Sequence, residues 1–192
     1  MIFETIGGHT FAPELLADGC IIDIGCRDFT FADYFTNSLV YCVDVDKKVF
    51  EGVNKPHTFI NAAISDKVGK SGYYENGEAT CIKEIDPDQS HPFIECDTIT
   101  MDRLYEITGT NVDILKLDCE GAEYIILGET FKSIPKQITV EFHHHCVPEL
   151  HNKSYGSIIE RLSNDYTVNN SVWEKRHGCG YNFWDTLFIR KW

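Results

Sequence analysis

The chain has 192 residues, of which 43% are hydrophobic and 12% aromatic, enough for a hydrophobic core that needs no disulfide or metal to hold it. Its 17 basic and 30 acidic residues give a formal net charge of −13, which repels phosphate backbones and anionic membranes. The sequence has no apolar stretch of about 20 residues, the length of a membrane-spanning helix, and no export signal at its start. We therefore expect one soluble, cytoplasmic domain over residues 1–192 that binds neither nucleic acid nor membrane; the composition does not indicate its oligomeric state.

Eight cysteines are spread along the chain, and no two of them form a C-x-x-C pair. Cys20, Cys42 and Cys119 lie in or beside apolar runs, where a free thiol packs like a small hydrophobic side chain. A chain of this length without an export signal favours reduced cysteines. We therefore expect neither a disulfide framework nor a structural zinc ribbon.

Apolar runs of strand length alternate along the chain with segments of helical periodicity. This alternation predicts an α/β fold: a doubly wound, mostly parallel sheet of about seven strands with helices on both faces. The expected strands lie at 20–25, 39–44, 57–61, 112–117 and 137–142, with a closing antiparallel pair at 166–172 and 186–190. The expected helices lie at 13–19, at the end of a helical lead-in (1–19), and at 29–37, 45–52, 101–108, 122–129 and 155–163.

Two segments stand apart from this alternation. Residues 66–98 are rich in Gly, Tyr, Asn, Asp and Pro and carry several turn signals, and short antiparallel strands are expected near 71–75 and 93–98. Near the end of the chain, aromatic residues surround a glycine-rich turn. They could stack on a sugar or pack against the edge of the sheet: Trp173, Tyr181, Phe183 and Trp184.

Acidic residues close the first two expected strands at a spacing typical of nucleoside binding. Asp23 and Gly25 close the first strand, and Asp44 closes the second about 20 residues later. In a doubly wound fold, the glycine makes a tight turn under the cofactor, and the acidic side chain accepts hydrogen bonds from the ribose hydroxyls. The alternative is that Asp44 is a helix N-cap, but the order and spacing favour the ribose role.

The turn after the first strand discriminates between nucleoside cofactors. A dinucleotide needs three glycines there so that its pyrophosphate can approach the backbone, and this turn contains only Gly25. S-adenosylmethionine (SAM) has no phosphate, so one glycine suits it better than it suits NAD or FAD. Arg27 could pair with the methionine carboxylate of SAM, or could be an exposed residue at a helix start.

Residues 112–127 place ionisable side chains between a buried strand and a helix, around a glycine turn. These side chains are Lys116, Asp118, Glu120 and Glu123. An open α/β sheet places its chemistry at such a strand end. The cluster could also be a charged surface loop: Lys116 and Asp118 share a strand face and could form a buried ion pair, and Glu123 suits a helix N-terminus.

The next expected strand ends in further titratable residues. Glu141 lies at its carboxyl end, next to the strand of Asp118, and His143 follows two residues later on the same face. His143 titrates near neutral pH and is the best candidate for a general base. Asp118, Glu141 and His143 could also share a divalent metal ion. The histidine run 143–145 is not expected to chelate as a unit, because adjacent side chains on an extended chain point in opposite directions.

A series of motifs, in chain order, resembles the FkbM-type methyltransferases. The most specific is the Lys-x-Asp-x-Glu-Gly-x-Glu run. The series consists of IIDIG (21–25), VDVD (43–46), NAAISD (61–66), CDTITMDRL (96–104), ILKLDCEGAEYIIL (114–127) and VEFH (140–143). The resemblance covers roughly residues 20–190. It departs at one turn, where the family's Gly-Ala-Asn-x-Gly is Gly-Cys-Arg-Asp-Phe and Phe29 replaces the second glycine.

The resemblance implies a SAM-dependent O-methyltransferase on a Rossmann-like sheet, acting on a hydroxyl of a small acceptor such as a saccharide or secondary metabolite. It assigns residues to the methionine end of the cofactor (Asp23 and Gly25), the ribose (Asp44) and the adenine (Asn61, Ala62 and Ala63). The residues that it places at the reaction centre are Lys116, Asp118, Glu120, Glu141 and His143, with Asp118 also reaching the cofactor. Segment 66–98 would be an insertion on the acceptor side.

Two other functions fit the same residues. Phe29 in the glycine turn is compatible with a non-catalytic module that binds SAM or another nucleoside. Asp118, Glu141 and His143 are compatible with a metal-dependent hydrolase. Methyl transfer would exclude the binding module, and a response to SAM without bound metal would exclude the hydrolase.

Overall fold

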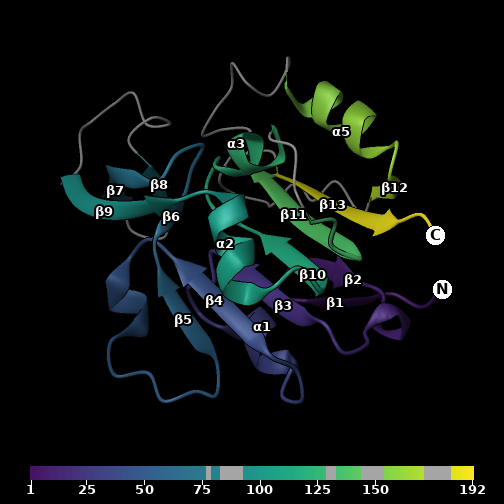
Figure 1. The fold of residues 1–192 in the computed structure, drawn as a ribbon, viewed down its shortest axis with the longest axis horizontal. Coiled ribbons are helices and arrows are strands. Elements are labelled where there is room, and N and C mark those ends of the chain that lie inside the picture. Colours follow the sequence, from purple (N-terminus) through teal and green to yellow (C-terminus); the bar gives the residue numbers. More distant parts are fainter. Residues whose placement is uncertain (77–78, 83–92, 129–132, 144–153, 171–182) are drawn as a thin grey trace.

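The computed structural model describes residues 1–76, 79–82, 93–128, 133–143, 154–170 and 183–192. Within these residues, seven strands form one sheet in the order β12-β13-β11-β10-β3-β4-β5 (Figure 1). The strands are β3 (Cys20–Ile24), β4 (Val40–Asp44), β5 (Thr58–Asn61), β10 (Val112–Leu117), β11 (Gln137–His143), β12 (Tyr166–Asn170) and β13 (Phe183–Arg190). The strands from β11 to β5 are parallel, and β13 is antiparallel to both of its neighbours. The predicted mostly parallel sheet with a closing antiparallel pair is confirmed.

The inner strands are buried on both faces. Every residue of β10 is buried, including the lysine in its sequence VDILKL. Neighbouring residues on a strand enter opposite cores: Ile22 and Leu115 belong to one, and Ile21 and Ile114 to the other. A nearly continuous apolar run is what a parallel strand needs when both faces are covered.

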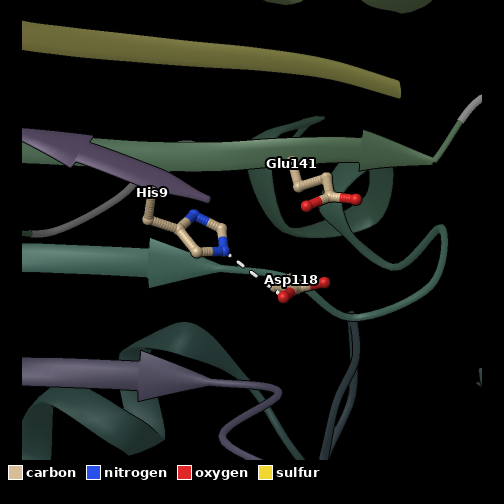
Figure 2. Close-up of side chains that lie close together, drawn as sticks. All are labelled: His9, Asp118 and Glu141. Atoms are coloured by element: carbon tan, nitrogen blue, oxygen red, sulfur yellow. Dashed lines mark hydrogen bonds and ion pairs between the residues drawn. The ribbon is translucent and has the colours of Figure 1, made fainter. Parts of the chain in front are cut away.

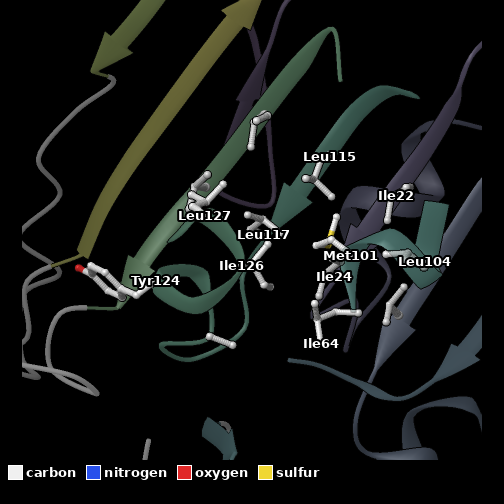
Figure 3. Close-up of a cluster of buried hydrophobic side chains, with 14 of the residues drawn as sticks. Ile22, Ile24, Ile64, Met101, Leu104, Leu115, Leu117, Tyr124, Ile126 and Leu127 are labelled. Atoms are coloured by element: carbon white, nitrogen blue, oxygen red, sulfur yellow. The ribbon is translucent and has the colours of Figure 1, made fainter. Parts of the chain in front are cut away.

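Helices from different parts of the chain cover both faces of this sheet, as predicted. The α-helices within the described residues are α1 (Thr30–Tyr34), α2 (Met101–Thr108), α3 (Glu123–Gly128) and α5 (Gly156–Leu162). Leu104 of α2 and Ile126 of α3 belong to the same core as the strand residue Leu115 (Figure 3), and α5 contributes Leu162 to it. Phe31 of α1 belongs to the core on the opposite face.

The first 19 residues differ from the prediction. They contain β1 (Glu4–Ile6), β2 (His9–Phe11) and a short 3-10 helix (Pro13–Leu15). Instead of the expected helical lead-in, an antiparallel hairpin turns at Gly7 and Gly8, both of which have positive φ. β2 contacts β11 and β13. The side chain of Gln137 anchors the hairpin, because it accepts a hydrogen bond from the Ala12 N–H (2.7 Å) and donates one to the Ala12 carbonyl (3.1 Å).

A second sheet follows β5 and has the order β6-β9-β7-β8. Its strands are β6 (Ala63–Ile64), β7 (Gly69–Asn76), β8 (Ala79–Ile82) and β9 (Phe93–Ile99). The antiparallel pairing of β7 with β9 agrees with the strands expected near 71–75 and 93–98. Because β5 ends at Asn61 and β6 begins at Ala63, this sheet leaves the large one at the carboxyl end of β5.

The remaining helices and strands are of the predicted type and differ from the predictions mainly in length. The helix predicted over 101–108 has those bounds, the one predicted over 29–37 is shortened to α1, and the one predicted over 45–52 is a 3-10 helix (Lys47–Phe50). The described cysteines are free thiols, as expected. None of the helices in the described ranges is long and apolar enough to cross a membrane.

Candidate functional site

The turn after β3 packs directly against the end of β10. Gly25 has a φ of +77°, and a Cβ at this position would lie 1.6 Å from the carbonyl oxygen of Asp118. Glycine is therefore required both by the backbone conformation and by the lack of space. The ammonium of Lys116 donates a hydrogen bond to the Gly25 carbonyl (2.6 Å). These contacts join the turn expected to hold the cofactor to the acidic end of β10.

Phe29 ends the same turn in the left-handed conformation, with φ 60° and ψ 9°. A glycine adopts this conformation without strain, so Phe29 keeps the backbone shape of the residue it replaces. Its ring is buried and lies 5.7 Å from the ring of Phe59 and 6.3 Å from that of Phe50, measured between centroids. The ammonium of Lys55 lies 4.9 Å from the centre of the Phe29 ring. The Phe29 side chain therefore occupies the core on the α1 face.

Asp44 closes β4 and pairs in register with Asn61 at the end of β5. Its Oδ1 accepts the N–H of Asp46 (2.9 Å), and Asn61 donates to the carbonyls of Asp44 and Val45 (2.9 and 2.8 Å). Burial raises the pKa of Asp44 to about 6, and the nearby charge of Asp46 adds to the rise. Asp46 is the N-cap of the 3-10 helix at Lys47–Phe50, so Asp44 does not have the capping role that was its alternative.

Lys116 connects the ends of β3 and β10. Its Nζ lies 3.0 Å from Oδ1 of Asp23 and 3.5 Å from Oδ2 of Asp118, and the side chains of Lys116 and Asp23 are almost fully buried. Burial alone would lower the pKa of Lys116, but Asp23 and Asp118 raise it well above its ordinary range. The lysine is therefore charged. The ion pair that was the alternative to a catalytic role for Lys116 is present, and Asp23 shares it.

The chain turns from Asp118 into α3 through a backbone that a buried carboxylate holds. Glu120 has a φ of +51° in this turn. The fully buried Glu123 accepts hydrogen bonds from the N–H groups of Cys119 (2.7 Å) and Gly121 (2.9 Å). Glu123 therefore fixes the turn that presents Asp118, a more specific role than the expected attraction to a helix N-terminus.

His143, at the end of β11, is surrounded by carboxylates. Its Nδ1 lies 2.9 Å from Glu123, and its Nε2 lies 3.6 to 3.7 Å from Asp118, Glu120 and Glu141. Burial would lower the pKa of His143, but the carboxylates, Glu123 foremost, raise it to about 10. In this arrangement the imidazole is protonated near neutral pH. It then donates hydrogen bonds and does not accept a proton as the predicted base would.

Asp118 lies at the centre of the cluster. Burial acts to raise the pKa of Asp118, but Lys116, His9 and His143 outweigh it and hold the pKa well below its ordinary value. Asp118 is therefore ionised. Its side chain is 31% exposed, more than that of any of these three neighbours, so it can meet a ligand.

His9 was not among the predicted site residues. It comes from β2, is 1% exposed, and its Nε2 lies 3.3 Å from Oδ2 of Asp118. Figure 2 shows His9 reaching toward Asp118 at the end of β10 and Glu141 on β11. One possible ligand atom from each of the three residues lies within 4.8 Å of the other two. The contact joins positions 109 residues apart, and a lone histidine gives no signal of such a contact in sequence.

The structure brings most of the predicted residues to neighbouring strand ends. Lys116 contacts Asp23, Gly25 and Asp118, and His143 connects this group to Glu120 and Glu141. Ala62 and Ala63 are buried beside Asp44, with the Ala62 N–H donating to the Asp44 carbonyl. Arg27 is exposed, and its charge acts against the rise in the pKa of Asp44. Outside the described part of the chain lie the side chains of Trp173, Tyr181, Phe183 and Trp184 and the histidines 144 and 145.

The model of the methyltransferase FkbM domain matches residues 23–182, most of the chain. Among solved structures, the fibrillarin pre-rRNA processing protein of Methanococcus jannaschii is similar with a TM-score of 0.53 at 11% identity, over 96% of this chain and 72% of that one. The Mtq2–Trm112 complex of E. cuniculi (TM-score 0.49, 10% identity, 93% and 88% covered) is also similar. So is a TehB-like SAM-dependent methyltransferase from Corynebacterium glutamicum (TM-score 0.46, 11% identity, 92% and 82% covered).

No curated protein matches the chain. The similarity to fibrillarin confirms the predicted doubly wound, Rossmann-like α/β fold. The family match covers the turn after β3, the end of β4 and the acidic end of β10, three of the segments that contribute to the candidate site. The chain therefore belongs to the FkbM methyltransferase family and is a SAM-dependent methyltransferase.

Proposed function

We propose that the protein is an O-methyltransferase that methylates a hydroxyl of a small acceptor, such as a saccharide or secondary metabolite. The observation that carries this proposal is the pair of carboxylates, Asp118 and Glu141, at the ends of adjacent parallel strands beside the Gly25 turn. Carboxylates accept hydrogen bonds from hydroxyl groups and hold them in a defined orientation. The site thus pairs an acceptor-binding edge with a cofactor turn.

The residues at the ends of β3 and β4 suit SAM. The tight Gly25 turn contains no phosphate-binding glycine series, and the Asp44 carboxylate is placed to accept hydrogen bonds from ribose hydroxyls. With a pKa of about 6, Asp44 is mostly ionised at neutral pH. Arg27 is exposed near Asp44 and suits the carboxylate at the methionine end. Bound SAM supplies an electrophilic methyl group on a sulfonium.

Methyl transfer to a hydroxyl requires alignment of the oxygen and loss of its proton. Asp118 and Glu141 would hold the hydroxyl so that a lone pair faces the methyl group, which is the main demand of an in-line displacement. The proton leaves to a carboxylate of this edge as the new O–C bond forms and the bond from the methyl group to the sulfonium breaks, releasing S-adenosylhomocysteine. Lys116 and His143 are positioning residues in this scheme, because both carry positive charge and hold the carboxylates at fixed distances.

A neutral acceptor fits the charge of the molecule. A net charge of −13 and an acidic acceptor edge repel anionic acceptors. We place the activity in the cytoplasm, on a single domain over residues 1–192 whose segment 66–98 covers the acceptor. The binding-module hypothesis was motivated by Phe29, and its buried ring and glycine-like backbone remove that motive. The hydrolase hypothesis loses its support because the chain is a methyltransferase.

The experiment is methyl transfer from methyl-labelled SAM to a panel of glycosides and polyols. We expect an alkali-stable methyl ether and, for Glu141→Gln, a loss of about 100-fold in transfer rate with S-adenosylhomocysteine affinity unchanged by calorimetry. Glu106→Gln is the matched control, because Glu106 is an exposed carboxylate on α2 that pairs with Arg103. Absence of cofactor binding, or an alkali-labile methyl ester as the product, would contradict the proposal.

A further inference from the structure

The N-terminal hairpin delivers a histidine to the acidic strand ends. His9 begins β2, and the bonds between Gln137 and the backbone of Ala12 fix the end of that strand against β11. The His9 ring also packs edge-on to Phe31, with 5.7 Å between ring centroids and a 75° angle between planes. Held from both sides and 1% exposed, His9 has little freedom to move away from Asp118 and Glu141 (Figure 2).

His9, Asp118 and Glu141 have the donor types and the spacing of a cation site. One possible ligand atom from each residue lies within 4.8 Å of the other two, and Nε2 of His9 lies 3.3 Å from Oδ2 of Asp118. Ligands that bind a common ion at about 2.1 Å lie about 3 to 4 Å from one another, so only small side-chain movements would complete the site. One imidazole nitrogen and two carboxylates suit a divalent ion that accepts both nitrogen and oxygen ligands, such as Mn²⁺ or Zn²⁺.

The His9 ring is incompletely bonded. Nε2 faces Asp118, whereas the buried Nδ1 has no hydrogen-bond partner among the described residues. A neutral imidazole has one donor and one acceptor nitrogen, and native structures leave few such buried atoms unpaired. His9 is thus a buried ring with an unused polar atom, held beside two carboxylates.

The charge around His9 also favours a cation. In the described part of the chain, the cluster contains five carboxylates, one lysine and two histidines: Asp23, Asp118, Glu120, Glu123, Glu141, Lys116, His9 and His143. Even if both histidines are protonated, the five carboxylates carry two more charges than the lysine and the two histidines together, so the cluster has a net negative charge. Excess buried charge is unfavourable unless a counter-charge lies close by. One divalent ion supplies that charge.

We propose that His9, Asp118 and Glu141 bind one divalent metal ion at the ends of β10 and β11. The ion would hold the acceptor oxygen, so this role rests on the proposed transfer to a hydroxyl, whereas the binding of the ion does not. His9 lies outside residues 23–182, the range of the family match, so the site would use a residue that the matched domain does not contain.

The test is calorimetric titration of chelator-treated protein with MnCl₂ and, separately, ZnCl₂. We expect one Mn²⁺ per chain and a loss of at least about tenfold in affinity for His9→Gln, which keeps a donor for Asp118 but removes the imidazole. His57→Gln is the matched control, because His57 is likewise buried and its Nε2 lies 3.0 Å from a carboxylate oxygen of Asp33. It should bind Mn²⁺ like the wild type.

A second variant tests the site if His9→Gln does not fold. Glu141→Gln removes an anionic ligand without changing the shape of the side chain, and it too should lose Mn²⁺ affinity. No binding of either metal by the wild type, or equal binding by the wild type and folded His9→Gln, overturns the proposal. Binding that depends on His144 and His145 and not on His9 also overturns it, because it would place the ion on the histidine run.

Calorimetry with S-adenosylhomocysteine on the same samples separates this proposal from the proposed function. Cofactor binding without Mn²⁺ binding overturns the ion site and leaves methyl transfer standing. Mn²⁺ binding that His9→Gln weakens, in a protein with no affinity for the cofactor, supports the ion site and contradicts the proposed function.

Discussion

Two turns at the ends of neighbouring parallel strands lie at the candidate site, and different forces hold them. The turn after β3, residues 25–29, ends in Phe29, and the turn after β10, residues 118–121, contains Glu120; both residues have positive φ. Aromatic packing around a buried ring holds the first turn, and the carboxylate of Glu123 holds the second. A non-glycine residue in the left-handed region is strained unless its surroundings fix it, and the two turns show two ways of doing so.

The two turns should respond differently to pH, because apolar packing holds one and ionised groups hold the other. Apolar packing is insensitive to pH, so the shape of the turn after β3 should persist wherever the protein is folded. The turn after β10 depends on ionised groups, with Glu123 bonded to two backbone N–H groups and to His143. The end of β10, where we propose that the acceptor binds, should therefore be the part of the candidate site that changes with pH and with bound cations.

The largest expected effect comes from the point where the two turns meet. Gly25→Ala places a Cβ against the Asp118 carbonyl in addition to the strain of a positive φ, and we expect a loss of more than about 4 kcal/mol in unfolding free energy, measured by urea denaturation. Gly52→Ala is the control, because Gly52 has a φ of +72° but nothing within 4 Å of the added Cβ. It should lose only about 1 to 2 kcal/mol. Equal losses would mean that backbone strain alone, and not the contact between turns, makes Gly25 necessary.

Glu123→Gln tests the electrostatic turn, with an expected loss of about 3 kcal/mol in unfolding free energy because it removes the charge of a buried ion pair. It should also lower the pKa of His143 from about 10, since Glu123 is the largest contributor to its rise. A histidine with a raised folded-state pKa stabilises the fold fully below its unfolded pKa, and this stabilisation is lost as the pH rises toward 10. The difference between wild type and Glu123→Gln should therefore be greatest below about pH 6.5 and shrink at higher pH.

Phe29→Leu provides the matched change in the other turn. Its loss of packing should change the unfolding free energy less steeply with pH than Glu123→Gln does, because Phe29 contacts Phe50, Phe59 and His57 through ring faces and edges and not through a buried ion pair. Denaturation of both variants at pH 6 and pH 9, with the His143 resonances followed by NMR, measures both quantities. A pH-independent loss for Glu123→Gln would remove the distinction between the two turns.

The parts of the molecule set by local pattern were predictable. The strand over 112–117 and the helix over 101–108 have the expected bounds, because periodicity and strong turn signals coincide there. Asp44 could be placed at the sheet edge, because the length of a strand and its crossover determines the spacing between strand ends. These features depend on residues close together in the chain.

The parts set by long-range contact were not predictable. His9 meets Asp118 only because a hairpin packs beside β11, and the segment that contains it was expected to be helical. The role of Glu123 depends on the direction of two backbone N–H groups, and the residue type alone equally suits a helix N-terminus. Phe29 suggested a non-catalytic binding module, because residue type does not reveal a left-handed backbone with the ring directed into the core.

The smallest effect is expected at Asp44, the carboxylate at the end of β4 that we propose binds the ribose. Its pKa of about 6 leaves roughly one tenth of the carboxylate ionised at pH 5 and nine tenths at pH 7. If ribose hydroxyls donate to the ionised form, affinity for S-adenosylhomocysteine should fall about tenfold between pH 7 and pH 5, and Asp44→Asn should remove this dependence.

As the pH rises, the contribution of Asp44 to the unfolding free energy should fall while its contribution to the affinity for S-adenosylhomocysteine rises. A carboxyl whose folded pKa exceeds its unfolded value binds its proton more tightly in the fold, so its contribution to unfolding free energy falls as the pH rises from about 4 to 6. Calorimetric affinities and urea midpoints at pH 5, 6 and 7 would show the two trends, each absent from Asp44→Asn. Affinity that does not change over this range in the wild type would mean that the ribose does not use the charge of Asp44. The ends of β3 and β4 would then hold the proposed cofactor by packing and backbone geometry alone.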